Sequence, residues 1–324
     1  MKKKYFLYLF LTLLLSDATN TAIFAQSLSL NWLFKPGMRF NTSFLPKQNV
    51  QDTINFGMLH FNTSLIIPVK GKAEANLSEF NIKGSQTFIT ANIGTRFLQT
   101  ELTSYQKLAH NFSIGVTHIQ ADMKNGVWFY TVNIGLVESP ETFDKISPFF
   151  IGAAAKVVLK GLNTHNIYGI GITYNYDRFI PIPLFGINRK LSDNWKFSMI
   201  LPAYAELTYS KNSDLQLSFR TDFSTFRTGI IPSNERSLTL AQLKEKTSLQ
   251  YRDVRLGFSV RYNAGSKLRL FAQAGAAGFR SLKVFQGDTA VRSYIPSFAP
   301  FLNIGVHINF GHAPLGSQLF GNEF

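Results

Sequence analysis

Cysteine is absent from this 324-residue chain, and long apolar runs are confined to its first 15 residues. Without cysteine the fold cannot use the disulfides that stabilise many exported domains. A helix that spans a membrane needs about 20 mostly apolar residues, and no run of that length follows residue 25. If the mature chain is integral to a membrane, it therefore crosses it with strands.

Acidic residues are also scarce, with 19 Asp and Glu against 33 Lys and Arg, a formal charge of +14. Removing residues 1–25, which hold three lysines and one aspartate, leaves 14 − 3 + 1 = +12. A basic excess favours nucleic-acid binding when the cations cluster on one face. Here they are scattered, without a block of like charges after residue 25. The sequence therefore predicts no nucleic-acid partner.

Residues 1–25 have the layout of a cleavable signal peptide. A positive start, Lys2 to Lys4, precedes the 11-residue apolar stretch Tyr5–Leu15, and Ala22-Ile-Phe-Ala25 ends in a small residue suited to cleavage. Its apolar core is too short to span a membrane as a helix. We expect export of a single mature domain, residues 26–324.

Aromatic residues are abundant, with 31 Phe and 12 Tyr, yet the mean hydropathy is only +0.01. The segment Asn303–Phe310 explains how: apolar and polar residues alternate through Asn-Ile-Gly-Val-His-Ile-Asn-Phe. Alternate side chains of a strand point to opposite faces, so one face is apolar and the other polar. Repeated along an exported chain, this pattern predicts an all-β fold, a transmembrane antiparallel β-barrel.

Fourteen segments carry strand patterns bounded by turn residues. They are Met38–Leu45, Asn55–Ile67, Thr87–Leu98, Leu108–Gln120, Val127–Leu136, Phe149–Leu159, Ile167–Tyr176, Ile182–Leu191, Trp195–Leu201, Ala205–Ser210, Leu215–Asp222, Arg252–Asn263, Lys267–Ala277 and Phe298–Phe310. A barrel of twelve strands results if Trp195–Leu201 continues into Ala205–Ser210, against which Pro202 argues. We expect 12–14 strands.

Connection lengths support the barrel, because such barrels have short periplasmic turns and longer outer loops. With both chain ends periplasmic, the long connections Val137–Ser147, Phe223–Tyr251 and Gly278–Ser297 all fall outside. Val69–Gln86 is long where a short turn is expected, while Tyr176–Ile182 and Pro202–Tyr204 are short where outer loops are expected. Within Phe223–Tyr251, Ser237–Lys246 could form a short helix.

Two groups of residues carry a resemblance. Pro183-Leu-Phe-Gly-Ile-Asn188, Asn194-Trp-Lys-Phe197, Ile200-Leu-Pro202 and Glu206-Leu-Thr-Tyr209 are similar to the central motifs of an uncharacterised family of bacterial outer-membrane barrels, a domain of unknown function. That resemblance implies the barrel fold and transfers no substrate or catalytic residue.

The last strand carries the other resemblance. Asn303, Gly305, Ile308 and Phe310 match the C-terminal signal that the barrel-assembly machinery reads, although fourteen residues follow Phe310. The resemblance implies that this machinery is a partner during biogenesis.

Placing apolar positions against lipid assigns the alternate ones to the barrel interior. The basic residues so assigned are Lys156, Lys190, Lys196, Arg220, Arg255, Arg261 and Arg269, with Glu206 and Asp222 as opposing acids. A charge on the lipid face costs about 2–4 kcal/mol at mid-depth, which supports this assignment. The group indicates either an anion-selective lumen or structural ion pairs inside a filled barrel.

Catalysis and metal binding have weak support. His110 and His118 share a strand face but lie about 27 Å apart at ~3.4 Å per residue, too far to bind one metal ion. Asp122 could orient His118, but no Ser lies in a nucleophile-elbow motif. We expect no cofactor, no metal and no enzymatic activity, with a lipid-modifying enzyme as the least favoured alternative.

The sequence thus predicts an integral barrel of the outer membrane, surrounded by lipid. Two functions remain open: a small-solute channel or structural envelope protein, and a surface binding or adhesion module that acts through its outer loops.

Overall fold

The computed structural model describes residues 36–51, 54–76, 81–102, 108–122, 125–138, 147–160, 164–175, 178–212, 214–230, 247–287 and 289–310. Fifteen β-strands account for most of these residues. They are β1 (Gly37–Gln51), β2 (Ile54–Asn76), β3 (Asn81–Thr100), β4 (Leu108–Asp122), β5 (Gly126–Glu138), β6 (Ser147–Leu159), β7 (Thr164–Asn175), β8 (Arg178–Lys190), β9 (Trp195–Leu201), β10 (Tyr204–Ser210), β11 (Leu215–Gly229), β12 (Thr247–Ala264), β13 (Leu268–Gln286), β14 (Thr289–Tyr294) and β15 (Ala299–Asn309).

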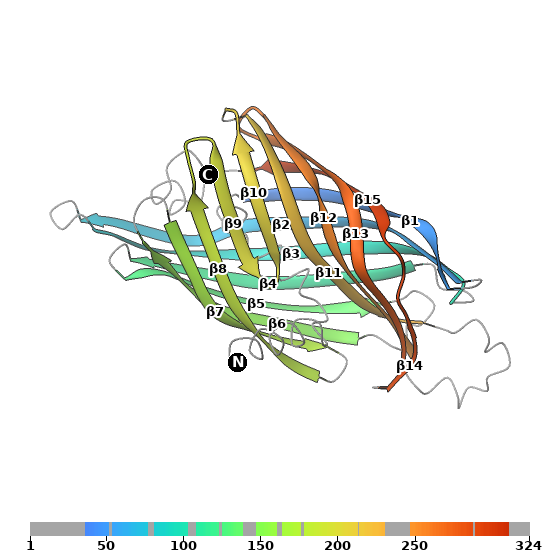
Figure 1. Ribbon diagram of the computed structural model, residues 1–324. Helices are drawn as coiled ribbons and strands as arrows, with labels where there is room; N and C mark the ends of the chain where they lie inside the picture. The colour runs from blue at the N-terminus through green and yellow to red at the C-terminus, as the bar shows by residue number, and fades with distance from the viewer. Residues whose placement is uncertain are drawn as a thin grey trace, which may run out of the picture.

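Fourteen of the strands close into a barrel (Figure 1). Each strand from β1 to β13 pairs with the next in antiparallel register, β13 also pairs with β15, and β15 pairs with β1. The seam is continuous, since Gly37 to Phe44 of β1 face Asn309 to Leu302 of β15. Strand β14 pairs only with the far end of β13 and lies outside the ring.

The prediction of fourteen barrel strands is confirmed, and the twelve-strand alternative is wrong. Residues Pro202 and Ala203 form a tight turn in which the Ala203 amide donates to the Ile200 carbonyl at 2.7 Å. Strands β9 and β10 then pair with each other from Tyr204↔Ile200 to Tyr209↔Trp195. Pro202 cannot donate a backbone hydrogen bond to a neighbouring strand, so the chain reverses there.

The two ends of the barrel differ in their connections. We call the end with Gly37, Asn309 and the β12–β13 turn the turn end, and the opposite end, with the β11–β12 connection, the loop end. Residues 176–177 and 202–203 make very short connections at the loop end. The longest one there is 230–246, far shorter than the predicted Phe223–Tyr251, because β11 and β12 stay paired from Leu215↔Tyr262 to Gly229↔Ser248.

Two segments predicted as connections are strands. Val69–Gln86 is the turn-end part of the β2–β3 hairpin, which stays paired to Asn76↔Asn81 and projects beyond its neighbours (Figure 1). Gly278–Ser297 contains the end of β13 and all of β14. Neither has the apolar alternation of a membrane-facing strand; Lys70, Lys72 and Glu74 are exposed and polar. Backbone pairing extends these strands past the region where that alternation is needed.

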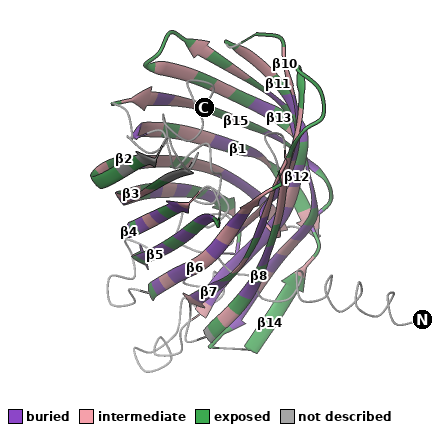
Figure 2. Ribbon diagram, turned by 90° about the vertical axis from the view of Figure 1, so that its left-hand side faces the viewer, coloured by how far each residue is buried: buried purple, intermediate pink, exposed green. Residues whose placement is uncertain are grey.

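Exposed and buried side chains alternate along many strands of the wall, as in β4 (Figure 2). Large apolar side chains point outward and are exposed around the ring, including Phe61, Ile93, Phe112, Ile134, Ile170, Phe219, Phe258, Leu270 and Ile304. An apolar surface of this extent is unfavourable in water and favourable in hydrocarbon. The closed ring also leaves no unpaired strand edge in the wall, as a transmembrane barrel requires.

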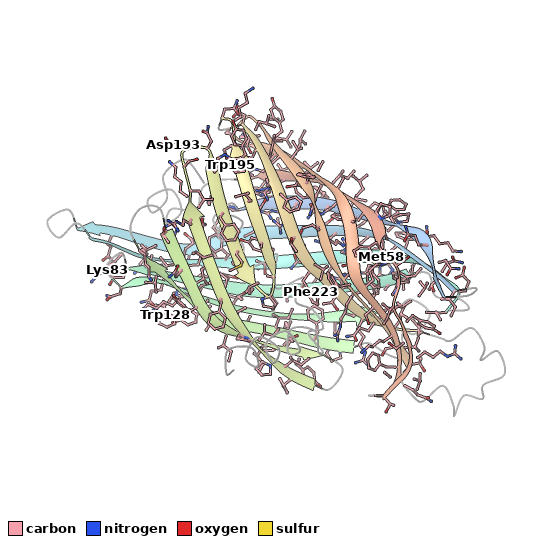
Figure 3. All side chains as sticks on the ribbon, viewed as in Figure 1. Met58, Lys83, Trp128, Asp193, Trp195 and Phe223 are labelled. Carbon is pink, nitrogen blue, oxygen red and sulfur yellow. The ribbon has the colours of Figure 1, made fainter. Side chains whose placement is uncertain are left out.

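Aromatic side chains gather on the outer face near the turn end. Trp128 stacks on Tyr130 with ring centroids 6.0 Å apart, and Trp195 lies 5.2 Å from Tyr209. In Figure 3, Trp128 and Trp195 lie toward the same end as Lys83 and Asp193, away from Met58 and Phe223. Tyr168 and Tyr262 are also exposed on the outer face.

Two predictions concern residues outside the described ones: the signal peptide, residues 1–25, and the short helix Ser237–Lys246.

In the part of the chain that the structure describes, no helix has the length and apolar character needed to cross a membrane.

Candidate functional site

The barrel interior holds the candidate site, and strand register decides which side chains enter it. Directly paired residues of neighbouring strands share a face. Glu206 of β10 pairs with Ser198 of β9 and Arg220 of β11, and Phe219 beside Arg220 is on the exposed outer face. Glu206, Arg220 and Ser198 therefore point inward.

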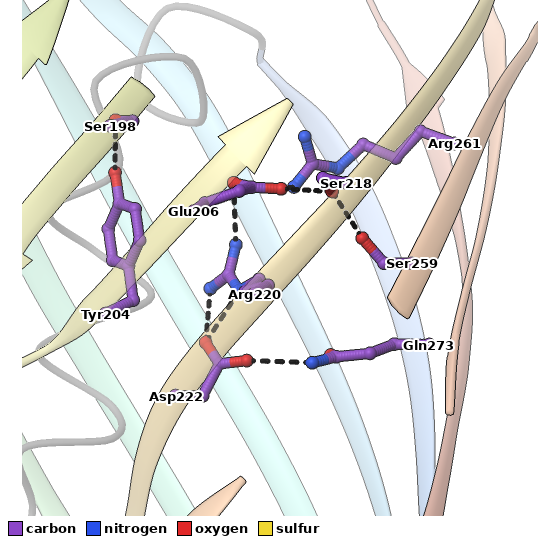
Figure 4. A network of polar contacts seen from close by, with 9 residues as sticks. All are labelled: Ser198, Tyr204, Glu206, Ser218, Arg220, Asp222, Ser259, Arg261 and Gln273. Atoms are coloured by element: carbon purple, nitrogen blue, oxygen red, sulfur yellow. Dashed lines mark hydrogen bonds and ion pairs between the residues drawn. The ribbon is translucent and has the colours of Figure 1, made fainter. Parts of the chain in front are cut away.

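Glu206 is the centre of an interior polar network (Figure 4). Its carboxylate forms ion pairs with Arg261 of β12 and with Arg220, the latter with 3.4 Å between Nη1 and Oε2. The Ser218 hydroxyl donates to Glu206 Oε1 at 2.6 Å. The Glu206 side chain is only 7% exposed, so two arginines and a hydroxyl compensate one carboxylate removed from water.

Asp222 extends this network along β11. Its carboxylate binds Arg220, with 2.6 Å between Nη2 and Oδ1, and accepts a hydrogen bond from Gln273 Nε2 of β13 at 3.1 Å. The Arg220 guanidinium also lies 4.7 Å from the ring centroid of Tyr204. Four strands, β10 to β13, are thus connected through side chains inside the barrel.

A second polar cluster lies further toward the loop end. Arg255 Nε donates to Asp253 Oδ2 at 3.1 Å, and its Nη1 donates to the Ser43 hydroxyl of β1 at 2.7 Å. The Tyr251 hydroxyl donates to the same Asp253 oxygen at 3.0 Å and accepts from Arg280 Nε at 2.9 Å. A bulge in β13 opposite Asp253 allows this: Phe279, with φ of 48°, is exposed outward while Arg280 is buried.

Apolar side chains fill the interior at the loop end. We define the apolar plug as Leu45, Phe56, Leu98, Phe226 and Tyr251 with the buried residues packed around them. These come from strands far apart around the ring. Phe56 of β2 stacks on Tyr251 of β12 with ring centroids 4.5 Å apart, and Arg96 of β3 lies over the Phe226 ring of β11 at 5.1 Å.

A second apolar cluster fills the side of the barrel formed by β2 to β10. Phe88, Ile119, Phe129, Ile151 and Leu184 point inward there, each 0–1% exposed. Residues of β5 and β11, on opposite sides of the ring, come within 8 Å of each other between Cα atoms. Side chains therefore fill this side of the described barrel interior.

Interior charges become less accessible with distance from the turn end. Of the ion-paired residues, the Lys190 side chain at the turn end is 47% exposed, Arg261 19%, Arg255 11% and Asp253 0%. Water therefore reaches Lys190 and Arg261 from the turn end, but it does not reach the carboxylate of Asp253 beside the apolar plug.

The register places six of the seven predicted basic residues on the interior face: Lys190, Lys196, Arg220, Arg255, Arg261 and Arg269. The seventh prediction is wrong. Lys156 pairs with exposed Trp128 and lies over its ring, with Nζ 5.4 Å from the centroid, on the outer face. Strand β6 is apolar on both faces, since Ile151 and Ala155 point inward, so alternation could not identify its lipid-facing side.

Four charged interior residues were missed: Arg39, Arg96, Asp253 and Arg280. Arg39 and Arg96 follow the alternation rule, because Met38 and Phe40 flank Arg39 and Phe97 follows Arg96. Alternation alone therefore predicts that both arginines point inward. Asp253 lies within the predicted strand Arg252–Asn263, two positions from Arg255, so alternation places it on the interior face as well. Arg280 belongs to the segment Gly278–Ser297, which is predicted as a connection and is paired in the structure.

His118 and Asp122, the two residues considered for catalysis, do not contact each other. His118 Nδ1 lies 2.9 Å from the Thr87 hydroxyl, and Asp122 accepts a hydrogen bond from Asn125 Nδ2 at 2.8 Å. His118 and Asp122 lie four positions apart on β4, about 14 Å at ~3.4 Å per residue, so Asp122 does not orient His118. Within the described residues no three His, Cys, Asp or Glu side chains gather closely enough to hold a metal ion.

The residues of the predicted assembly signal lie at the seam of the barrel. Asn303 and Gly305 pair with Ser43 and Asn41 on the interior face of β1, and Ile308 pairs with Met38. A Cβ at residue 305 would overlap the Asn41 side-chain amide, which accounts for glycine there. Phe310 follows β15, is exposed, and its amide donates to the Pro36 carbonyl at 3.1 Å.

Several solved structures are similar to the chain at low identity. The chain is similar to the beta domain of the Bordetella autotransporter Brka, with 9% identity over 85% of this chain and 100% of that one and a TM-score of 0.32. The transport unit of the autotransporter AIDA-I from Escherichia coli is 11% identical over 90% of this chain and 96% of that one, with a TM-score of 0.34. LpxR from Salmonella typhimurium is 6% identical over 84% of this chain and 100% of that one, with a TM-score of 0.35. Such values transfer no activity or ligand.

None of the curated proteins compared with the chain matched it. One family model does match, over residues 21–311, which include every described strand. The chain therefore belongs to the family described as Domain of unknown function (DUF6268).

Proposed function

We propose that this protein is an integral outer-membrane β-barrel with a structural role in the envelope, and that it does not act as an open diffusion pore. The apolar plug carries this proposal. In a conducting barrel, inward side chains contact water along the whole passage. Here Leu45, Phe56 and Tyr251 point inward and are 0% exposed.

The outer-membrane location rests on two features. The exposed apolar belt and closed ring suit a membrane that is crossed by strands, and residues 1–25 have the pattern of an export signal. The last strand, β15, pairs with β1 at the seam, which suits its proposed recognition by the barrel-assembly machinery. The proposal assigns no catalytic role to any residue.

A conductance measurement tests the structural role. Purified full-length protein, reconstituted into planar bilayers, is expected to give no stepwise current, while a general porin in the same membranes serves as the positive control. Steady anion-selective conductance by the wild-type protein would contradict the proposal.

The second candidate is an anion-selective channel, favoured by the partial exposure of Lys190 and Arg261 toward the turn end. This function requires the apolar plug to move, because it closes the route at the loop end. A binding role for the outer loops is the remaining alternative; residues 139–146 and 231–246, the longest of those loops, lie outside the described part of the chain.

A further inference from the structure

A lysine lies among aromatic side chains on the outer face, near the turn end. Lys156 of β6 is directly opposite Trp128 of β5 and Tyr168 of β7, so the three side chains form one row across neighbouring strands. Trp128 and Tyr168 are 39% and 47% exposed. Paired side chains on one face have Cβ atoms about 4.5–5.5 Å apart. We call Trp128, Lys156 and Tyr168 the interfacial row.

The interfacial row presents hydrogen-bond donors and one positive charge. The Tyr168 hydroxyl accepts a hydrogen bond from Asn166 Nδ2 at 3.1 Å, which leaves its own proton for another partner. The Lys156 Nζ lies 5.4 Å from the centroid of the Trp128 ring, and such a contact leaves the charge in place because the ring is neutral. Within the described part of the chain, no carboxylate forms an ion pair with Lys156.

The row lies at the boundary of the apolar wall. Trp128 is two residues from Gly126, where β5 begins, about 7 Å at ~3.4 Å per residue. Further along β5, the outward residues Val132 and Leu136 are apolar and exposed. In a bilayer that covers those residues, Lys156 reaches the headgroup level by extending its apolar stem along the wall. Tryptophan and tyrosine are enriched at the same level.

We propose that the interfacial row binds the phosphate of an anionic phospholipid in the leaflet at the turn end. This inference rests on the proposed function, because it requires the barrel to lie in a membrane. Charge complementarity favours a lipid with a net negative charge, since a zwitterionic headgroup already carries an ammonium beside its phosphate. Lys156 supplies the positive charge, while the indole N–H and the phenol O–H supply hydrogen bonds. The headgroup lies against the wall, so the packed interior takes no part.

Quenching of tryptophan fluorescence by brominated phospholipids tests the row on the full chain in liposomes. The chain has three tryptophans, so Trp32→Phe with Trp195→Phe leaves Trp128 alone. Brominated phosphatidylglycerol is expected to compete for the site about fivefold better than brominated phosphatidylcholine, the preference that one lysine near an anionic headgroup provides. Lys156→Gln should remove this preference, and Lys156→Arg should keep it.

Trp195 provides the matched control. It lies in the other aromatic pair at the turn end, with Tyr209, and its row continues through Leu217 and Val260 without a cation. A chain with Trp195 as its single tryptophan, made by Trp32→Phe with Trp128→Phe, should be quenched equally by the two brominated lipids.

The possible results separate this proposal from the proposed function. Equal quenching of Trp128 by the two lipids, or a preference that survives Lys156→Gln, would overturn the lipid site and leave the membrane barrel intact. Absence of quenching by either lipid would contradict the membrane barrel as well. If the single-tryptophan variants do not fold, native mass spectrometry compares the wild type with Lys156→Gln. The wild type should then retain more phosphatidylglycerol through detergent exchange, and equal retention would refute the site.

Discussion

At the scale of single residues, the carboxylate of Glu206 is the shared partner of two interior arginines. It is nearly buried and holds Arg220 and Arg261 on two neighbouring strands. Removing one partner from such a group leaves the other charges uncompensated, and this loss exceeds any stability that the intact pair contributes.

Glu206→Gln is therefore expected to lower the free energy of unfolding by about 3–5 kcal/mol, measured by urea denaturation in detergent. The matched control is Asp193→Asn, which breaks the Lys190 ion pair at a side chain that is 98% exposed. Exposed pairs contribute about 0–1 kcal/mol. Equal losses in the two variants would show that the Glu206 network is not buried as described.

Glu101 gives a pH-dependent contact at the loop end, just beyond β3. It accepts a hydrogen bond from the Asn55 amide at 2.7 Å and binds Lys47 with 2.6 Å between Nζ and Oε1. Burial acts to raise the pKa of Glu101, but the bonds from Lys47 and Asn55 outweigh it and lower that pKa below its ordinary value.

Because the folded pKa is lowered, the contact is fully present above the ordinary carboxyl pKa and is lost as pH falls through the lowered value. We expect hydrogen exchange at the Asn55 amide, corrected for its intrinsic rate, to accelerate below that pKa. Glu101→Gln should show the faster exchange at neutral pH as well. An Asn55 rate that is indifferent to both changes would refute the contact.

At the scale of elements, the β2–β3 hairpin projects past its neighbours at the turn end. Beyond Ala73↔Gly84 it pairs almost entirely with itself, since β4 reaches only as far as Lys83↔Asp122. Its exposed lysines and glutamate pack against no apolar cluster.

Replacing residues 74–83 by Asn-Gly is expected to leave the barrel folded, because a two-residue turn suits the paired ends Ala73 and Gly84. Heat-modifiable migration on gels, in which the folded barrel runs faster than the boiled chain, measures this. The matched comparison is Gly135→Val, which directs a side chain into the Phe149 ring inside the barrel and should cost about 1–3 kcal/mol. A truncated chain that never folds would mean that the projection is needed for assembly.

Elements also show what the sequence can predict. Strands such as β12, with Val254, Leu256 and Phe258 on one face and Arg255 and Gly257 between them, reveal their orientation because only one face is apolar. Strand β6 does not, because its interior face packs against Phe129 and Ile167 and is as apolar as its outer face. Alternation therefore predicts the wrong face for Lys156, and it carries no sign of the filled interior.

The positions at which strands end are also not predictable from the alternation pattern. Apolar alternation marks the part of a strand that faces hydrocarbon, whereas backbone pairing continues beyond it in β2, β3, β11 and β13. The cross-barrel contacts, such as Phe56 with Tyr251, join residues nearly 200 positions apart. No local pattern predicts such contacts, since they depend on closure of the whole ring.

At the scale of the whole molecule, the barrel has an apolar outer wall and a packed interior with basic residues toward one end. The absence of native cysteine makes both testable by single spin labels, because every label sits at a chosen position. Leu256, Phe258 and Val260 point outward on β12, and Ser259 between them is 2% exposed and points inward.

The most direct test is the collision rate of labels at these four positions with oxygen, which concentrates in lipid, and with a water-soluble nickel chelate, in reconstituted liposomes. We predict that the labels at 256, 258 and 260 collide mainly with oxygen and that the label at 259 is shielded from both reagents. Preferential collision of the outward labels with the nickel chelate would contradict the membrane-facing wall. Free access of the chelate to the label at 259 would contradict the packed interior.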